Sequence, residues 1–166
     1  MSTVSITTTE NGLRGNEMKL SLLFAALFVF GGYCNITAQG VQTKVPYDSY
    51  KGITIGMPAA DVRTKLGKRT DESDAEDDFT FSETESARVF YDDKKTVRVI
   101  SIMYTGDLKL APTPKTVVGT DVPPKADGGI QKTVQYPKAG FWISYSRTGG
   151  DDAIVMITLQ KMAKEN

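Results

Sequence analysis

The chain has 166 residues, with 20 lysines and arginines, 20 aspartates and glutamates, one cysteine and no histidine. A formal net charge of zero leaves no basic excess to neutralise phosphates, which argues against nucleic-acid binding. Without histidine, the chain lacks imidazole metal ligands and the usual base that activates a serine or cysteine nucleophile. Carboxylates, lysines and tyrosines remain, so we expect a non-enzyme that uses no cofactor and no metal.

An apolar run, Leu20–Phe30, follows Met18 and a lysine. A short basic start followed by such a run is typical of a secretory signal peptide, and the run is shorter than the roughly 20 apolar residues that span a membrane. Residues 18–38 are therefore predicted to be a signal peptide cleaved after Ala38. Residues 1–17 are predicted to be a leader that results from a wrongly assigned start codon, with Met18 as the true start. An uncleaved anchor is the alternative. The mature protein is predicted to be periplasmic or secreted.

The single cysteine, Cys34, lies within this predicted signal peptide. Tyr33 just before it and Gly31 three positions before it do not fit a bacterial lipid-attachment site, which argues against lipidation. Cleavage after residue 38 leaves a chain without thiols, so its hydrophobic core must stabilise the fold without disulfides. The remaining chain is long enough for one domain.

Two short helices are predicted. Residues 58–66 give the clearest pattern, because a proline begins it, Gly67 suits its C-terminal cap, and Val62 lies on its apolar side with Arg63 turned outward. Residues 113–119 show similar signals for the start and end of a helix: a capping threonine, a proline and a final glycine. Helices this short are marginal alone, so each must pack on other elements.

Stretches rich in β-branched and aromatic residues predict antiparallel strands. Two pairs span residues 88–91 with 96–104 and 141–146 with 153–159, and weaker strands are predicted at 79–82 and 131–136. The predicted fold class is α+β: a short helix followed by antiparallel strands, in two degenerate helix-plus-hairpin repeats that form one sheet. A shift of 52 residues places Gly67 on Gly119 and favours duplication, with chance as the alternative.

The predicted organisation follows from these elements. Residues 1–17 are the leader, 18–38 the signal peptide, 39–49 a tether, 50–106 the first helix-plus-hairpin unit and 107–162 the second unit. The two units are therefore expected to carry whatever function the exported chain has.

Six carboxylates lie within eight residues, from Asp71 to Asp78. Hard oxygen ligands of this kind suit calcium. The run lacks, however, the alternating acidic residues followed by a turn glycine that a calcium-binding loop has. Runs of like charge usually remain solvated. We therefore predict a mobile acidic loop here, with calcium binding as the alternative.

Alternation along the strands predicts two faces, with Tyr91 on the core face and Arg88 and Phe90 on the opposite face. The same alternation places Trp142 with Phe90. Aromatic side chains among small polar neighbours are frequent anchors of protein–protein contacts. The protein-binding candidates are Phe90, Trp142, Arg88 and Tyr104. The alternative interpretation is that the helices cover this face and the rings belong to the core.

The segment Ile53-Thr54-Ile55-Gly56-Met57, followed by Val62 and Leu66-Gly67, resembles the I-x-x-G-M…V…L-G opening of small secreted bacterial domains. Two families share this opening: the SmpA/OmlA family, which includes the small lipoprotein of outer-membrane barrel assembly, and the β-lactamase-inhibitor-protein-like domains. The resemblance implies an envelope assembly or scaffold module or, as the alternative, a secreted enzyme inhibitor. We therefore expect an exported, non-catalytic protein-binding domain whose partner is a protein.

Overall fold

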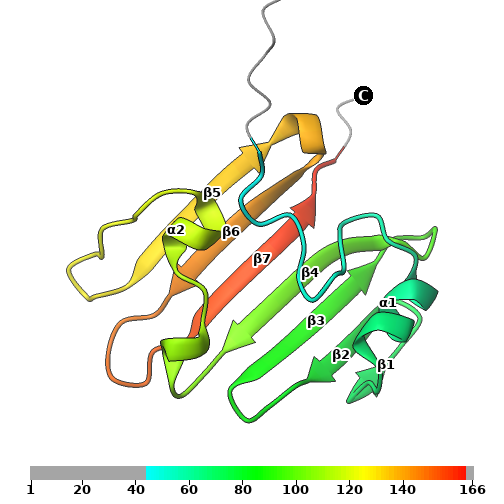
Figure 1. Ribbon diagram of the computed structural model, residues 1–166, viewed down its shortest axis with the longest axis horizontal. Helices are drawn as coiled ribbons and strands as arrows, with labels where there is room; N and C mark the ends of the chain where they lie inside the picture. Colours follow the sequence, from blue (N-terminus) through cyan, green and yellow to red (C-terminus); the bar gives the residue numbers. More distant parts are fainter. Residues whose placement is uncertain (1–43, 164–166) are drawn as a thin grey trace, which may run out of the picture. The chain divides into compact units, whose positions relative to one another are not determined.

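The computed structural model describes residues 44–163, which form a seven-stranded antiparallel sheet and two short α-helices (Figure 1). The strands are β1 (Asp71–Glu72), β2 (Glu76–Thr80), β3 (Glu85–Tyr91), β4 (Val97–Tyr104), β5 (Ile130–Tyr136), β6 (Phe141–Arg147) and β7 (Val155–Lys161). Their order across the sheet is β1-β2-β3-β4-β7-β6-β5. The fold class is α+β, as the sequence predicts.

The first helix, α1 (Ala59–Leu66), begins after a proline and ends at Gly67. Gly67 has a φ of 79°, a region that glycine enters without steric cost, and its N–H donates to the carbonyl of Arg63. Ala59 and Val62 are buried and attach the helix to the sheet. The helix begins one residue later than its sequence predicts, with Pro58 as the N-cap, and it ends at the predicted residue with Val62 on its buried side.

The second helix, α2 (Pro114–Val118), is one short turn with complete caps. The hydroxyl of Thr113 accepts a hydrogen bond from the N–H of Thr116, and Gly119 ends the helix in the left-handed conformation. Two 3₁₀ turns, η1 (Leu108–Leu110) and η2 (Pro137–Ala139), complete the helical content of the described residues. The caps that predict this helix in the sequence are thus the caps observed.

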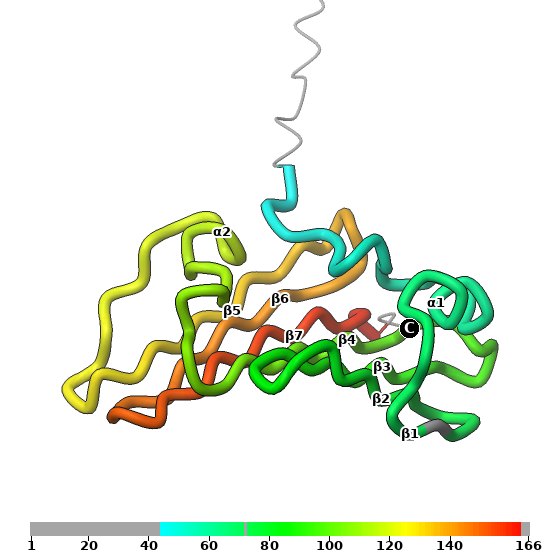
Figure 2. Tube along the Cα trace, turned by 60° about the horizontal axis from the view of Figure 1, so that its bottom comes forward, coloured from blue at the N-terminus to red at the C-terminus, as the bar shows by residue number. Residues whose placement is uncertain are grey.

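The helices cover one face of the sheet. Figure 2 shows α1, α2 and the segment that precedes α1 on the same side of the strands. Alternate residues of the long strands point to this side and pack against Tyr50, Ile53, Val62, Val117 and Val118. The strands contribute Phe79, Ala87, Val89, Tyr91, Val97, Ile100, Ile102, Tyr104, Ile130, Phe141, Ile143, Tyr145, Val155, Ile157 and Leu159 to the core. Burial of each large apolar side chain stabilises the fold by about 1.5–3 kcal/mol relative to exposure.

The two predicted units meet in the middle of the sheet, where β4 pairs with β7. Each unit consists of a helix followed by three consecutive antiparallel strands, with β1 added at the edge of the first unit. The shift of 52 residues does not continue through the strands, because β4 and β7 begin farther apart, at Val97 and Val155. Duplication of one ancestral unit therefore stays an interpretation.

The prediction of a mobile acidic loop at residues 71–78 is wrong. These residues form β1, a tight turn and most of β2, and they pair antiparallel with each other. Asp77 is fully buried and accepts hydrogen bonds from Arg63 and Tyr91. Arg63 therefore turns toward the sheet, contrary to its predicted outward orientation. Within this run, Asp77 is paired with Arg63 and Arg69, and Asp78 is paired with Arg88.

The predicted leader and signal peptide, with Cys34, lie outside the described residues. Within residues 44–163, neither helix has the length and apolar character that crossing a membrane requires.

Candidate protein-binding surface

The second face of the sheet, which we call the open face, has neither helix on it (Figure 2). Its side chains come from the strand residues that alternate with those of the core. Strand register assigns to it Glu76, Asp78, Thr80, Ser86, Arg88, Phe90, Val99, Ser101, Met103, Gln131, Thr133, Gln135, Trp142, Ser144, Ser146, Met156, Thr158 and Gln160. The sequence predicts this face correctly at Arg88, Phe90 and Trp142.

Small uncharged polar residues dominate the open face. Serine, threonine and glutamine fill most positions, and the charged residues lie toward β2, β3 and β4, at Glu76, Asp78 and Arg88 and at Arg98 beside Phe90. Hydroxyl and amide groups keep favourable contacts with water and are costly to bury without hydrogen-bond partners. Such a face is stable in solvent, and a permanent apolar cover would fit it poorly.

Phe90 and Trp142 lie in one row across this face. Phe90 is opposite Val99 on β4, Val99 is opposite Gln160 on β7, and Gln160 is opposite Trp142 on β6. Three strand spacings therefore separate the two residues, which corresponds to about 14 Å between their backbones. Both side chains are half-buried. The two rings thus stand on the same surface, far enough apart to contact different parts of a partner.

The backbone near Phe90 is irregular. A β-bulge lies between Phe90 and Tyr91, so that Arg98 on β4 is an extra residue without an opposite partner. The Arg98 guanidinium lies 5.7 Å from the centre of the Phe90 ring, in the geometry of a cation–π contact. This contact places a cation over the ring of Phe90, whose side chain is half-buried.

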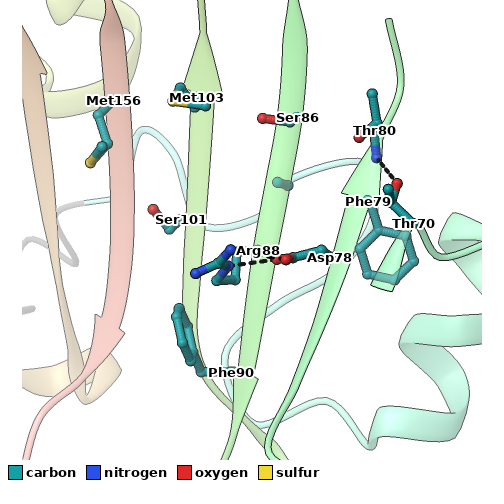
Figure 3. Close-up of a pocket in the computed structure, with 11 residues that line it drawn as sticks. Thr70, Asp78, Phe79, Thr80, Ser86, Arg88, Phe90, Ser101, Met103 and Met156 are labelled. Carbon is teal, nitrogen blue, oxygen red and sulfur yellow. Dashed lines mark hydrogen bonds and ion pairs between the residues drawn. The ribbon is translucent and has the colours of Figure 1, made fainter. Parts of the chain in front are cut away.

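A hollow of about 470 Å³ lies on the open face beside Phe90. Figure 3 shows Arg88 in its middle, Phe90 at one end, and Met103 with Met156 at the other. Arg88 donates to Asp78 from Nε over 2.6 Å and from Nη2 over 2.9 Å. These hydrogen bonds, with the Asp78 charge, raise the pKa of Arg88 above its ordinary value. The pair fixes a planar cation where a partner's carboxylate or carbonyl could approach.

Sequence reasoning missed two members of this surface, Met103 and Met156. They are opposite each other on β4 and β7 and are 38% and 41% exposed. Exposed methionines are adaptable contact residues, because the thioether side chain is flexible and polarisable. The signal was present in the alternation of Ser101 and Met103 with Ile100 and Ile102 along the predicted strand.

Tyr104 does not belong to the open face, and its assignment as a contact residue is corrected. It has the same strand parity as Ile100 and Ile102, so its ring points into the core and is 7% exposed. Its hydroxyl lies 3.3 Å from Oε1 of Glu85, which also accepts a hydrogen bond of 2.8 Å from Tyr50. Burial, together with the nearby carboxylate, raises the pKa of Tyr104. The residue anchors the segment before α1 to the sheet.

Asp77 is the second carboxylate on the covered face. Arg63 Nε donates to it over 2.8 Å and the Tyr91 hydroxyl over 2.7 Å, and Arg69 lies 3.5 Å away. Burial alone would raise the pKa of Asp77, but the hydrogen bonds from Arg63 and Tyr91 and the positive charges lower it overall. Asp77 therefore stays ionised and links α1 to β2 and β3.

Three carboxylates of the described strands are engaged by other side chains. Asp77 and Glu85 are engaged by tyrosines and cations inside the covered face, and Asp78 is paired with Arg88 at the hollow. Among residues 44–163, no group of three or more histidine, cysteine or acidic side chains is arranged to hold a metal ion. Comparisons of the chain with protein-family models, with curated proteins and with solved structures found no match.

Proposed function

We propose that this chain is an exported, non-catalytic protein-binding domain and that the open face is its contact surface. The observation that carries the proposal is a sheet face without helices that presents Phe90, Trp142, Met103 and Met156 among serines, threonines and glutamines. Large aromatic side chains in the middle of a surface supply most of the energy of protein contacts, while surrounding polar groups exclude water.

Export is supported by the apolar run Leu20–Phe30 behind Met18. Cell fractionation and N-terminal sequencing test it, and the expected result is a periplasmic or secreted chain that starts at Gln39. A cytosolic chain that retains residues 1–17 would contradict it.

Within this class, an envelope assembly or scaffold module is the function that we put first. The resemblance of Ile53–Gly67 to the SmpA/OmlA opening supports it, although these residues have structural roles here. Ile53 and Val62 are fully buried, and Gly56 has a φ of 85° in the turn before α1. The motif therefore bears on the fold, and the open face bears on the function.

The central experiment compares variants in a capture from envelope extract. Tagged wild-type protein, Trp142→Ala and Leu110→Ala are used as baits, and retained proteins are identified by mass spectrometry. Leu110 is a matched control, because it is 80% exposed and lies in η1 outside the sheet. We expect a protein that wild type and Leu110→Ala retain equally and that Trp142→Ala binds about 30-fold less, the effect of a hot spot worth about 2 kcal/mol. Equal retention by all three baits would remove Trp142 from the contact.

Inhibition of a secreted enzyme is the second candidate. The hollow beside Arg88 favours it, since its volume of about 470 Å³ suits a side chain or loop of an enzyme. The identity and behaviour of the captured protein distinguish the two functions. A hydrolase that forms a 1:1 complex and loses its activity supports inhibition, whereas membrane association that survives a salt wash supports the assembly module.

A further inference from the structure

β5 forms a free edge of the sheet. It is seven residues long and pairs with β6 on one side. On its other side, residues 131–135 form no backbone hydrogen bond with any part of the described chain. The opposite edge of the sheet is different, because β1 has only two residues. A long edge with unused backbone donors and acceptors is the part of a sheet that accepts another strand.

The backbone groups on this edge are fixed by the hydrogen bonds farther into the sheet. Just beyond the paired residues of β6 and β7, Thr148 N–H donates to the carbonyl of Ile154. Because successive strand residues direct their N–H and C=O to opposite sides, alternate β6 residues from Phe141 to Arg147 direct theirs to β5. The residues opposite them on β5 are Tyr136, Val134, Lys132 and Ile130. The intervening residues Gln131, Thr133 and Gln135 therefore direct their N–H and C=O groups outward.

The edge lacks most features that prevent strands from joining. Proline, a bulge or a short length usually blocks an exposed edge. β5 contains no proline, its register with β6 is unbroken, and residues 131–133 and 135 are exposed. One charged residue, Lys132, lies within the strand, and its side chain is on the helix-covered side. The end of the strand beside the 119–129 connection carries one further contact, from Lys125 Nζ to Gln131 Oε1 over 3.2 Å.

This edge is complementary to itself. In an antiparallel pair of two β5 strands with Thr133 at the two-fold axis, Gln131 faces Gln135 of the second copy and Thr133 faces its counterpart. Threonine pairs directly opposite each other are favourable cross-strand neighbours. Lys132 then lies opposite Val134 of the second copy, so the two lysines do not face each other. In this register, no two residues of like charge lie directly opposite each other across the two β5 strands.

We propose that two copies of this chain associate edge to edge through β5, antiparallel, with Thr133 on the two-fold axis. The dimer continues the sheet from one copy into the other and keeps both open faces on the same side. It is independent of the proposed function, since it uses the strand edge and not the rings of Phe90 and Trp142. A single pair of edge strands is a small interface, so the association is weak and reversible.

Sedimentation equilibrium over a wide concentration range tests the dimer, with protein expressed from the complete chain and purified in the form that accumulates. For wild type, we expect the mass to rise with concentration from one chain toward two. Thr133→Lys and Thr133→Glu should each stay monomeric, because like charges then meet on the axis. An equimolar mixture of the two should associate again, because opposite charges then meet. Thr80→Lys is the matched control: Thr80 is exposed on the same face at the far end of the sheet, and this variant should dimerise like wild type.

Thr133→Pro provides a second test. It removes an outward N–H without removing a hydrogen bond between β5 and β6, so the fold should remain and association should be lost. Wild type that keeps the mass of one chain at all concentrations overturns the proposal. So does association that survives in Thr133→Lys, or a lysine–glutamate mixture that stays monomeric. An edge that accepts only a foreign strand would appear as monomeric wild type whose capture of a protein is lost in Thr133→Pro.

Discussion

The two faces of the sheet are built from the same strands and have opposite characters. The covered face carries isoleucine, valine, leucine and tyrosine under two helices, while the open face carries hydroxyl and amide side chains with a few large exceptions. Neighbouring residues show the difference most clearly. Asp77 is fully buried and held by Arg63 and Tyr91, whereas Asp78 lies on the open face with Arg88. The contrast shows that the covered face holds the hydrophobic core, and it is the basis for proposing the open face as the contact surface.

Two aromatic residues of β6 are expected to show the largest difference in stability between the two faces. Tyr145 is 3% exposed in the core, and Trp142 is half-buried on the open face. We expect Tyr145→Ala to reduce the free energy of unfolding by about 3–5 kcal/mol and Trp142→Ala by about 1 kcal/mol. Urea denaturation followed by circular dichroism measures both. Equal losses would mean that Trp142 belongs to a core and that the open face is assigned wrongly.

The adjacent aspartates give the next largest effect. Asp77→Asn removes a buried charge on which Arg63 and Tyr91 converge, and we expect a loss of about 3 kcal/mol. Asp78→Asn weakens an ion pair at the surface, so its loss should be several times smaller. Chemical denaturation of both variants at neutral pH checks the comparison. A larger loss from Asp78 would contradict the assignment of the structural role to Asp77.

Lowering the pH should diminish the loss of stability that Asp77→Asn causes. Because the folded protein holds the pKa of Asp77 below its ordinary value of 3.8, this carboxylate stabilises the fold at pH values above 3.8. The contribution is lost as pH falls below that value and through the lowered pKa of the folded state. The difference in unfolding free energy between wild type and Asp77→Asn should therefore shrink between neutral pH and strong acid. A difference that is constant with pH would exclude an ionic origin.

The smallest change in stability is expected at the methionines. Met103→Ser and Met156→Ser replace exposed side chains on the open face, so each should change the unfolding free energy by no more than about 0.5 kcal/mol. Retention of the captured protein should nevertheless fall, because these side chains border the hollow. Met57→Ser, at a side chain packed against the core, is the destabilising comparison. Unchanged retention in both methionine variants would confine the contact to the aromatic residues and Arg88.

Local patterns in the sequence predict the parts of this fold that depend on local physics. Gly67 and Gly119 end helices because both positions require a positive φ, and Thr113 caps α2 through its own side chain. The alternation that separates Tyr91 from Phe90 and Arg88 also holds, because one face of the sheet is covered and the other is not.

Patterns that depend on distant residues were not predictable in the same way. Within the acidic run, Asp77 is paired with Arg63 of α1 and with Arg69, and these contacts between elements leave no local signal in the run itself. Tyr104 was assigned to the wrong face although it has the same strand parity as Ile100 and Ile102, so regular alternation along β4 already places it in the core. The pairing of β4 with β7, which joins the two units, is likewise a long-range contact without a local signal.

The central place of β7 has a consequence for how the polypeptide reaches this structure. The strand formed last during synthesis lies between β4 and β6, so neither unit has its final neighbour until the carboxyl-terminal residues are present. Pairings of such high sequence separation are slow to form. A nascent polypeptide that stops before Val155 would leave β4 and β6 as two unprotected borders, each prone to aggregation. Completion of the sheet therefore waits for the residues of β7.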